Sequence, residues 1–237
     1  MVPVSFAPFP FAGHDWHMVD GRALYWPRER ALLVADLHLE KASWYAKTGQ
    51  PLPPYDSRET LERVAAAIRA TGARRVFTLG DNFHDGEGPE RLEPHARGML
   101  DALTRAVDWV WVTGNHDEKH GPEHHATRRA PGGSQVEEIE VGGMLLRHRT
   151  VPGETRPELS GHFHPRLQVS IRGRRIVRPC VVAADAKMIL PAFGALTAGM
   201  DAADPVIRAA LRPALQADAI VPAAGKLLRF PLWSAAA

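Results

Sequence analysis

The 237-residue sequence has only one cysteine, Cys180, so it cannot form an intramolecular disulfide and a cytoplasmic location is the simpler expectation. It lacks the roughly 18 consecutive apolar residues that a membrane helix needs. Its first residues contain neither a basic segment nor a long apolar stretch, so we expect no signal peptide. For the same lack of long apolar stretches, we expect no membrane span. The formal net charge of +2 permits a nucleic-acid partner without requiring one. Histidine, in contrast, occurs 12 times and is the commonest metal ligand.

The first half of the sequence alternates predicted strands and helices. Three apolar runs have the length of buried strands: residues 31–35, 75–79 and 109–113. Between the first two runs, apolar residues at helical spacing predict a helix that Asp56 or Ser57 caps and Gly72 ends. A second helix is expected to begin near Pro89 and to extend to about Ala106.

The second half predicts β-hairpins instead. The expected strand pairs are 136–141 with 144–148, and 167–171 with 176–182. Strand–helix alternation followed by hairpins indicates an α/β fold with mixed sheets rather than a purely parallel one. Because no repeat or linker is visible, we expect residues 1–237 to form a single domain.

Polar residues follow each predicted buried strand. The three segments are Asp36-Leu37-His38, Gly80-Asp81-Asn82-Phe83-His84-Asp85 and Gly114-Asn115-His116-Asp117. Ligands of α/β sheets bind beyond the carboxyl ends of strands, so these groups are expected to converge. Two later segments add His148, at a strand end, and the pair His162 and His164. The glycines before Asp81, Asn115 and His162 allow tight turns that would aim side chains at a shared site.

Each segment alone is a weak signal. A lone D-x-H is more often a polar strand end, GNHD suits an ordinary turn, and GHFHP suits a hydrogen-bonded loop pair. Together and in this order, the segments favour a metal site. Oxygen and imidazole ligands without thiolates suit Mn²⁺, Fe or Zn²⁺. A carboxylate can also bridge two ions about 3.5–4 Å apart, the spacing of two-metal sites.

The ordered set resembles the calcineurin-like metallophosphoesterase superfamily. The resemblance implies a four-layer α/β/β/α sandwich with two mixed sheets and a dinuclear site between loops at one end. It implies that Asp81 bridges two metals, the first held also by Asp36, His38 and His164, and the second by Asn115, His148 and His162. The ions would lower the pKa of a water, so that hydroxide attacks phosphorus. The catalytic role of His116 would be to stabilise the developing charge or to protonate the leaving oxygen.

Two further likenesses narrow the family. The GDxFH pattern that ends at His84 looks like the recombination-repair nucleases, in which the equivalent histidine sits beside the catalytic one and helps to position substrate; orienting a metal ligand is the alternative role. Residues 36–61 and 188–201 are similar to the bacterial ligase-associated DNA-damage-response metallophosphoesterases, although Ala198 stands where a second glycine is expected. Members are regarded as Mn²⁺-dependent phosphodiesterases or endonucleases associated with a DNA ligase, a helicase and an exonuclease.

Basic and loop residues supply the candidates for substrate contacts. Arg149 flanks His148, with Arg147 and Arg156 close in the sequence, and would bind substrate phosphate together with Asn115 and His116. A second group, for which a solvated hairpin face is slightly favoured over DNA contact, comprises Arg172, Arg174, Arg175 and Arg178. Exposed loop positions are favoured over substrate contacts for His120, His124 and His125.

Three functions stay open from the sequence. The first is an Mn²⁺-dependent phosphodiesterase, a DNA endonuclease, acting in DNA repair. The second is a small-molecule phosphoesterase for a nucleotide or cyclic nucleotide, which the lack of an obvious DNA-recognition domain keeps open. The third is a non-catalytic scaffold, which the complete ligand set and His116 argue against.

Overall fold

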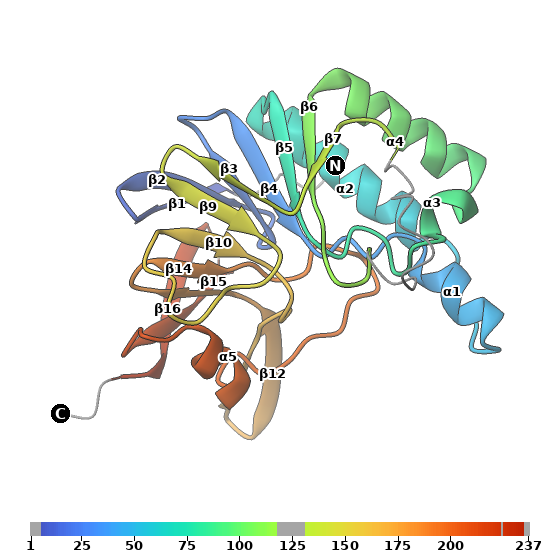
Figure 1. Cartoon of the computed structure of the whole chain (residues 1–237). Coiled ribbons are helices and arrows are strands. Elements are labelled where there is room, and N and C mark those ends of the chain that lie inside the picture. Colours follow the sequence, from blue (N-terminus) through green and yellow to red (C-terminus); the bar gives the residue numbers. More distant parts are fainter. Residues whose placement is uncertain (1–5, 118–130, 224, 235–237) are drawn as a thin grey trace.

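Figure 1 shows the computed structural model of the chain, which describes residues 6–117, 131–223 and 225–234. Two seven-stranded sheets pack against each other, and helices lie on the outside of the pair. The loop histidines considered above lie outside the described residues: His120, His124 and His125.

The first sheet contains all three predicted buried strands. Its order is β1-β2-β3-β4-β5-β6-β7, antiparallel from β1 to β4 and parallel from β4 to β7. The strands are β1 (Phe6–Phe11), β2 (His14–Val19), β3 (Ala23–Trp26), β4 (Ala31–Ala35), β5 (Arg75–Leu79), β6 (Asp108–Val112) and β7 (Ser134–Val136). The three N-terminal strands were not predicted from the sequence.

The second sheet is also mixed, with the order β16-β15-β13-β14-β10-β9-β8. Only β14, β10 and β9 are mutually parallel. Its strands are β8 (Glu138–Val141), β9 (Met144–Arg147), β10 (Glu158–Ser160), β13 (Val181–Ala184), β14 (Lys187–Ile189), β15 (Ala217–Ala223) and β16 (Lys226–Trp233). A separate hairpin pairs β11 (Arg166–Ile171) with β12 (Arg174–Pro179). The predicted hairpins are therefore present, although the second ends before β13.

The helices are α1 (Lys41–Lys47), α2 (Asp56–Thr71), α3 (Gly88–Arg91), α4 (Pro94–Ala106) and α5 (Pro205–Ala210). Helix α2 ends at Gly72 as expected, with the glycine in the left-handed conformation at φ 67°. The predicted caps of α2 are wrong. The Asp56 carboxylate accepts a hydrogen bond from the backbone N–H of Ala42 instead, and Ser57 Oγ accepts one from that of Glu40. Both side chains thus hold the start of α1.

The second predicted helix is in fact two helices. Pro94 lacks an amide hydrogen and disfavours helical backbone at the residue before it, so the chain breaks at Leu92-Glu93. Glu93 takes an extended conformation and caps α4 by accepting hydrogen bonds from the backbone N–H groups of His95 and Ala96. The first of the two helices begins near Pro89 as predicted, and Pro94 begins the second.

Successive side chains of the central strands point to opposite faces of the first sheet, so the hydrophobic core has one part on each face. In β4, Leu33 faces the second sheet, whereas Leu32 and Val34 pack on the side of α2 and α4, and all three are fully buried. The outer face of the second sheet is covered by the short helix α5 and by hairpin residues such as Leu167. The expected α/β fold with two mixed sheets is confirmed. No helix among the described residues is long and apolar enough to cross a membrane.

Candidate metal centre

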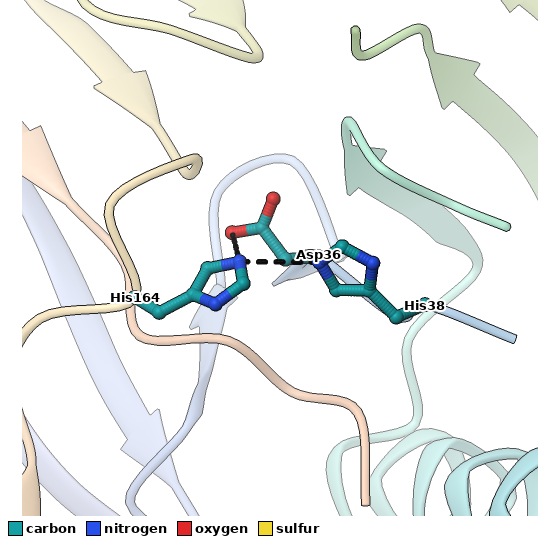
Figure 2. Close-up of side chains that lie close together, drawn as sticks. All are labelled: Asp36, His38 and His164. Atoms are coloured by element: carbon teal, nitrogen blue, oxygen red, sulfur yellow. Dashed lines mark hydrogen bonds and ion pairs between the residues drawn. The ribbon is translucent and has the colours of Figure 1, made fainter. Parts of the chain in front are cut away.

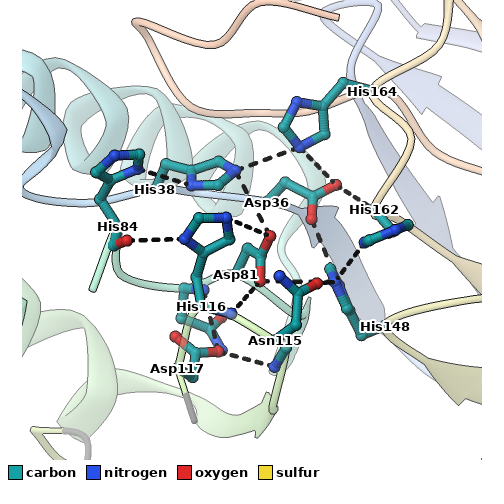
Figure 3. Close-up of polar contacts among 12 residues, drawn as sticks. Asp36, His38, Asp81, His84, Asn115, His116, Asp117, His148, His162 and His164 are labelled. Atoms are coloured by element: carbon teal, nitrogen blue, oxygen red, sulfur yellow. Dashed lines mark hydrogen bonds and ion pairs between the residues drawn. The ribbon is translucent and has the colours of Figure 1, made fainter. Parts of the chain in front are cut away.

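The candidate site lies where loops from both sheets meet (Figure 3). Strands β4, β5 and β6 of the first sheet lead into three of these loops, and β9 and β10 of the second sheet lead into two. In chain order the loops carry Asp36 and His38; Asp81 and His84; Asn115 and His116; His148; and His162 and His164. The packing of the two sheets therefore brings together the seven proposed metal ligands, His84 and His116.

A first group of ligand atoms comes from Asp36, His38 and His164 (Figure 2). One ligand atom from each lies within 4.8 Å of the others. The Nε2 atoms of His38 and His164 are 3.3 Å apart, and His164 Nε2 is 3.5 Å from Asp36 Oδ2. Asp36 is completely buried, and the two imidazoles are largely so.

A second group comes from Asp81, His148 and His162, again within 4.8 Å of one another. His148 Nε2 lies 3.0 Å from His162 Nδ1 and 2.9 Å from Asn115 Oδ1. Asn115 thus places an amide oxygen beside this group.

The Asp81 carboxylate lies between the two groups. Its Oδ1 is 3.5 Å from His148 Nε2, and its Oδ2 is 3.8 Å from His38 Nε2. Each oxygen therefore faces a different group, which is the arrangement of a bridging carboxylate. The structure contains two candidate His/Asp metal sites consistent with a dinuclear centre.

The hydrogen-bonding pattern fits a cation in the first group. Asp36 Oδ1 is buried without a hydrogen-bond partner, which is costly for a carboxylate unless a positive charge compensates it. His164 Nδ1 lies 3.2 Å from the Ala198 carbonyl oxygen, to which it can only donate, so the neutral ring presents a lone pair at Nε2. That lone pair faces His38 Nε2, an arrangement that a divalent cation between the rings would stabilise.

Strained backbone conformations hold the ligands. Five of the seven predicted metal ligands have left-handed φ angles of 39° to 75°: Asp36, His38, Asp81, His162 and His164. Backbone hydrogen bonds between the loops compensate for this strain. The N–H of His38 donates to the Asp81 carbonyl at 2.9 Å, and that of His162 donates to Asp36 Oδ2 at 2.9 Å. The ligands thus hold one another in place.

The glycines of the motifs serve mainly to make room. Gly80 has a positive φ of 74°, as the predicted turn requires, but Gly114 and Gly161 do not. A Cβ at Gly114 would overlap the backbone nitrogen and Oδ1 of Asp81, and one at Gly161 would come within 2.6 Å of Asp36 Oδ2. Close approach between loops, rather than turn geometry, explains these two glycines.

His116 is held beside both groups without belonging to either. Its Nδ1 lies 2.9 Å from the carbonyl oxygen of His84, and its Nε2 lies 3.9 Å from Asp81 Oδ2. Its ring stacks on that of His84 at 5.4 Å between centroids. The His116 side chain is 29% exposed, so its Nε2 can reach a molecule bound at the centre.

His84 has two contacts of different kinds. Its carbonyl oxygen accepts the hydrogen bond from His116, while its imidazole Nδ1 lies 3.4 Å from His38 Nδ1. A hydrogen bond at Nδ1 leaves His38 Nε2 free for a metal. The geometry therefore supports both roles considered from the sequence, placement beside His116 and orientation of a metal ligand.

Asp117 was expected from the sequence to lie near the site, but no role was assigned to it. Its Oδ2 accepts hydrogen bonds from the backbone N–H of Gly114 at 2.9 Å and the Asn82 amide at 2.9 Å, and its Oδ1 accepts one from the N–H of Phe83 at 3.1 Å. It ties the loop after β6 to the loop after β5. The final Asp of GNHD was the available signal, because aspartate accepts hydrogen bonds from turn amides.

Burial keeps key imidazoles in the neutral form. Burial, followed by the neighbouring His148 and Arg149 side chains, lowers the pKa of His162 to about 4. Burial and the nearby charge of Lys41 lower the pKa of His84 to about 4. Neutral imidazole is the form that binds metals, so the environment of His162 favours ligation over protonation at neutral pH. Burial also acts to lower the pKa of His164, but the contacts of this ring with Asp36 outweigh that effect and raise the pKa instead.

The three arginines near His148 differ in their surroundings. Arg147 is buried, with Nη1 3.6 Å from a Glu158 carboxylate oxygen, and Arg156 forms an ion pair with Glu154 at 2.6 Å. Arg149 is exposed and forms no ion pair among the described residues. Of the three, Arg149 alone keeps a guanidinium that is free for substrate.

Comparisons with known proteins agree with this geometry. The family model for calcineurin-like phosphoesterases matches residues 29–152. The structure is similar to that of nuclease MPE from Pseudomonas putida, with 26% sequence identity, a TM-score of 0.68, and coverage of 95% of this chain and 100% of that chain. A weaker similarity, with a TM-score of 0.37 and 14% identity, links it to the phosphoesterase Yfce from E. coli, covering 80% of this chain and 86% of that chain. No curated protein sequence matches the chain.

Proposed function

The chain belongs to the calcineurin-like phosphoesterase family, and from this premise we propose that it is an Mn²⁺-dependent phosphodiesterase that cleaves DNA. It is a metallophosphoesterase, a hydrolase of phosphoester bonds, with two His/Asp groups for metals. The observation that carries the proposal is the Asp81 carboxylate, whose two oxygens face the two groups at 3.5 and 3.8 Å.

The proposed ligand sets share Asp81. Asp36, His38 and His164 would complete the first set, and Asn115, His148 and His162 the second. When bound, two divalent cations would neutralise phosphoryl charge and lower the pKa of an attacking water. Oxygen and nitrogen ligands of this kind suit Mn²⁺, with Fe and Zn²⁺ as the alternatives.

The residues of the chain would orient and protonate the substrate. His116, fixed through Nδ1 by the His84 carbonyl, would direct Nε2 at the leaving oxygen and, when protonated, donate its proton there. Asn115, which is exposed, would add an amide contact to a phosphoryl oxygen. Arg149 would bind a phosphate at the rim.

DNA as the substrate is supported by two likenesses. The structure is similar to a protein described as a nuclease, and residues 36–61 and 188–201 resemble the ligase-associated DNA-repair enzymes. The proposed partnership with a DNA ligase, a helicase and an exonuclease depends on the second likeness alone. The basic hairpin of β11 and β12 offers further exposed arginines, among them Arg174, Arg175 and Arg178.

Turnover of two chromogenic esters tests the proposal. Metal-loaded protein is expected to hydrolyse bis(p-nitrophenyl) phosphate faster than p-nitrophenyl phosphate when Mn²⁺ is supplied. Single-stranded, duplex and nicked DNA would then be compared with a panel of nucleotides and cyclic nucleotides. Preference for the monoester would exclude the phosphodiesterase, cleavage of nucleotides alone would favour the small-molecule enzyme, and no turnover at all would favour the scaffold.

A further inference from the structure

A hollow adjoins the candidate metal centre, and His164 belongs to both. The polar residues that line the hollow are Arg22, His164, Arg166 and Thr197. His164 Nε2 belongs to the first ligand group, 3.5 Å from Asp36 Oδ2. A molecule in the hollow would therefore lie next to whatever reacts at the centre.

Positive charge collects at this hollow. Burial, followed by the charges of Arg63 and Arg166, lowers the pKa of Arg22, and the carboxylates of Asp20 and Glu59 only partly offset this effect. Arg63 lies 4.6 Å over the ring of Phe193. Within the described part of the chain, no ion pair joins any of the three to a carboxylate. An anion would relieve the repulsion that acts on Arg22.

Arg166 has unused hydrogen-bonding capacity. Its Nε is buried without a hydrogen-bond partner, and the described residues supply none for the rest of its guanidinium. The aliphatic part of the side chain packs where a Cβ at Gly199 would stand. Arginine presents its donors as a planar fork that matches the oxygens of a phosphate.

One segment joins the hollow to the metal centre. The carbonyl oxygen of Ala198 lies 3.2 Å from His164 Nδ1, while those of Ala192 and Gly194 each accept a hydrogen bond of 3.4 Å from Arg22. Residues 188–201, which the sequence singled out without a function, thus hold a predicted metal ligand and an arginine together. Ala198 is not among the residues with positive φ, so its alanine is not strained where a glycine was expected.

From these contacts we infer that the hollow is a subsite for a second phosphate group of the substrate, adjacent to the phosphate that is hydrolysed. The inference rests on the proposed phosphodiesterase function. Arg166 is the principal contact, Arg22 adds charge, and His164 separates the two phosphate positions. The second phosphate could belong to the neighbouring residue of a nucleic-acid strand or to a nucleoside diphosphate, and the chemistry of recognition is the same in both.

Binding of matched ligands tests the subsite without requiring turnover. Metal-loaded His116→Ala protein would be titrated with the dinucleotide TpT and with TpT carrying a phosphate at its 5′ or its 3′ end. One of the terminal phosphates is expected to tighten binding about tenfold, in the range of a charge-assisted contact. Arg166→Gln should abolish this gain, and Arg166→Lys, which keeps the charge but not the fork, should retain part of it. Arg229→Gln, an exposed change on β16, is the control and should keep the full gain.

The outcomes separate the subsite from the proposed function. The subsite would be overturned if a terminal phosphate tightens the binding of neither the dinucleotide nor thymidine monophosphate, or if the gain persists in Arg166→Gln. Comparing the binding of thymidine 5′-diphosphate with that of the monophosphate identifies the source of the second phosphate. If the second phosphate tightens binding, in an Arg166-dependent way, only in the diphosphate, the substrate is a nucleotide. If a terminal phosphate tightens the binding of the dinucleotide, the substrate is a nucleic-acid strand. The phosphodiesterase function fails independently, if protein with His116 intact does not hydrolyse bis(p-nitrophenyl) phosphate or TpT.

Discussion

His116 Nδ1 lies 2.9 Å from the carbonyl oxygen of His84, and the two imidazole rings stack on each other. Because a carbonyl can only accept, His116 carries its Nδ1 proton toward His84 and presents Nε2 to the centre. The main chain, rather than a carboxylate, thus orients the candidate catalytic histidine. Its side chain lies beside the proposed ligands, with Nε2 3.9 Å from Asp81 Oδ2, without belonging to either group of ligand atoms.

Replacing His116 with alanine is therefore expected to separate chemistry from metal binding. Diester turnover should fall about 100- to 10,000-fold, the usual contribution of a general acid. Metal content, measured by inductively coupled plasma mass spectrometry, should stay at the level of the unmodified protein. Loss of metal together with activity would show that His116 is a ligand.

Asp81→Asn should have the opposite effect. The substitution keeps the size of the side chain but removes the negative charge that faces both groups of ligands, so occupancy of both metal sites should decrease. Asp85→Asn is the control, since Asp85 belongs to the same motif but pairs with Arg91. Full occupancy in the Asp81 variant would contradict the bridging role.

His84→Phe tests whether His84 orients His38. Phenylalanine can preserve the stack on His116 and leaves the main-chain carbonyl in place, but it removes the nitrogen 3.4 Å from His38 Nδ1. We expect metal affinity to fall about 10- to 100-fold, as when the hydrogen-bond partner of a metal ligand is lost. Titration with Mn²⁺, with the exposed His95→Phe as control, would measure it. Unchanged affinity would leave His84 only its role beside His116.

Gly114→Ala is expected to disrupt the centre through a single methyl group. The added Cβ would overlap the backbone nitrogen and Oδ1 of Asp81, so the loops after β5 and β6 would have to separate. Gly98→Ala is the matched control, because the added Cβ there meets no atom within 4 Å. In helix α4 it should stabilise the protein by up to about 1 kcal/mol. Thermal unfolding and metal content distinguish the two. Normal metal binding by Gly114→Ala would refute the steric argument.

The pH dependence of stability can be tested at Cys180. Burial raises the pKa of this thiol to about 12 from its ordinary value of 9.0. Between these two values the native state binds more protons than the unfolded state, so the thiol's contribution to the free energy of unfolding decreases as pH rises. Between pH 9 and 11, the free energy of unfolding measured in urea should therefore decrease less for the Cys180→Ala variant than for the unmodified protein. At pH 8 the native thiol should react with a disulfide reagent far more slowly than the unfolded one, and rapid reaction would show that Cys180 is accessible.

Local signals predicted the central strands. The apolar runs that form β4, β5 and β6 are continuous because both faces of these strands are buried. The N-terminal strands β1 to β3 gave no comparable signal, because residues such as His14 and Asp15 interrupt the apolar pattern. Likewise, the Asp56 and Ser57 side chains could not be assigned to α1 from the sequence, because their partners lie 14 and 17 residues away.

What the sequence determined by itself is the chemistry of the candidate site, since the donor atoms of Asp, Asn and His are properties of the residue type. Their order along the chain also identified the family. Only the tertiary structure decided how these residues divide into two groups, and that Asp81 faces both. It also decided that Arg147 and Arg156 form ion pairs with carboxylates, while the Nε atom of Arg166 has no hydrogen-bond partner. The physical reason is that hydrogen bonds, ion pairs and burial depend on contacts between segments as far apart as Asp36 and His164, and the packing of the two sheets creates those contacts.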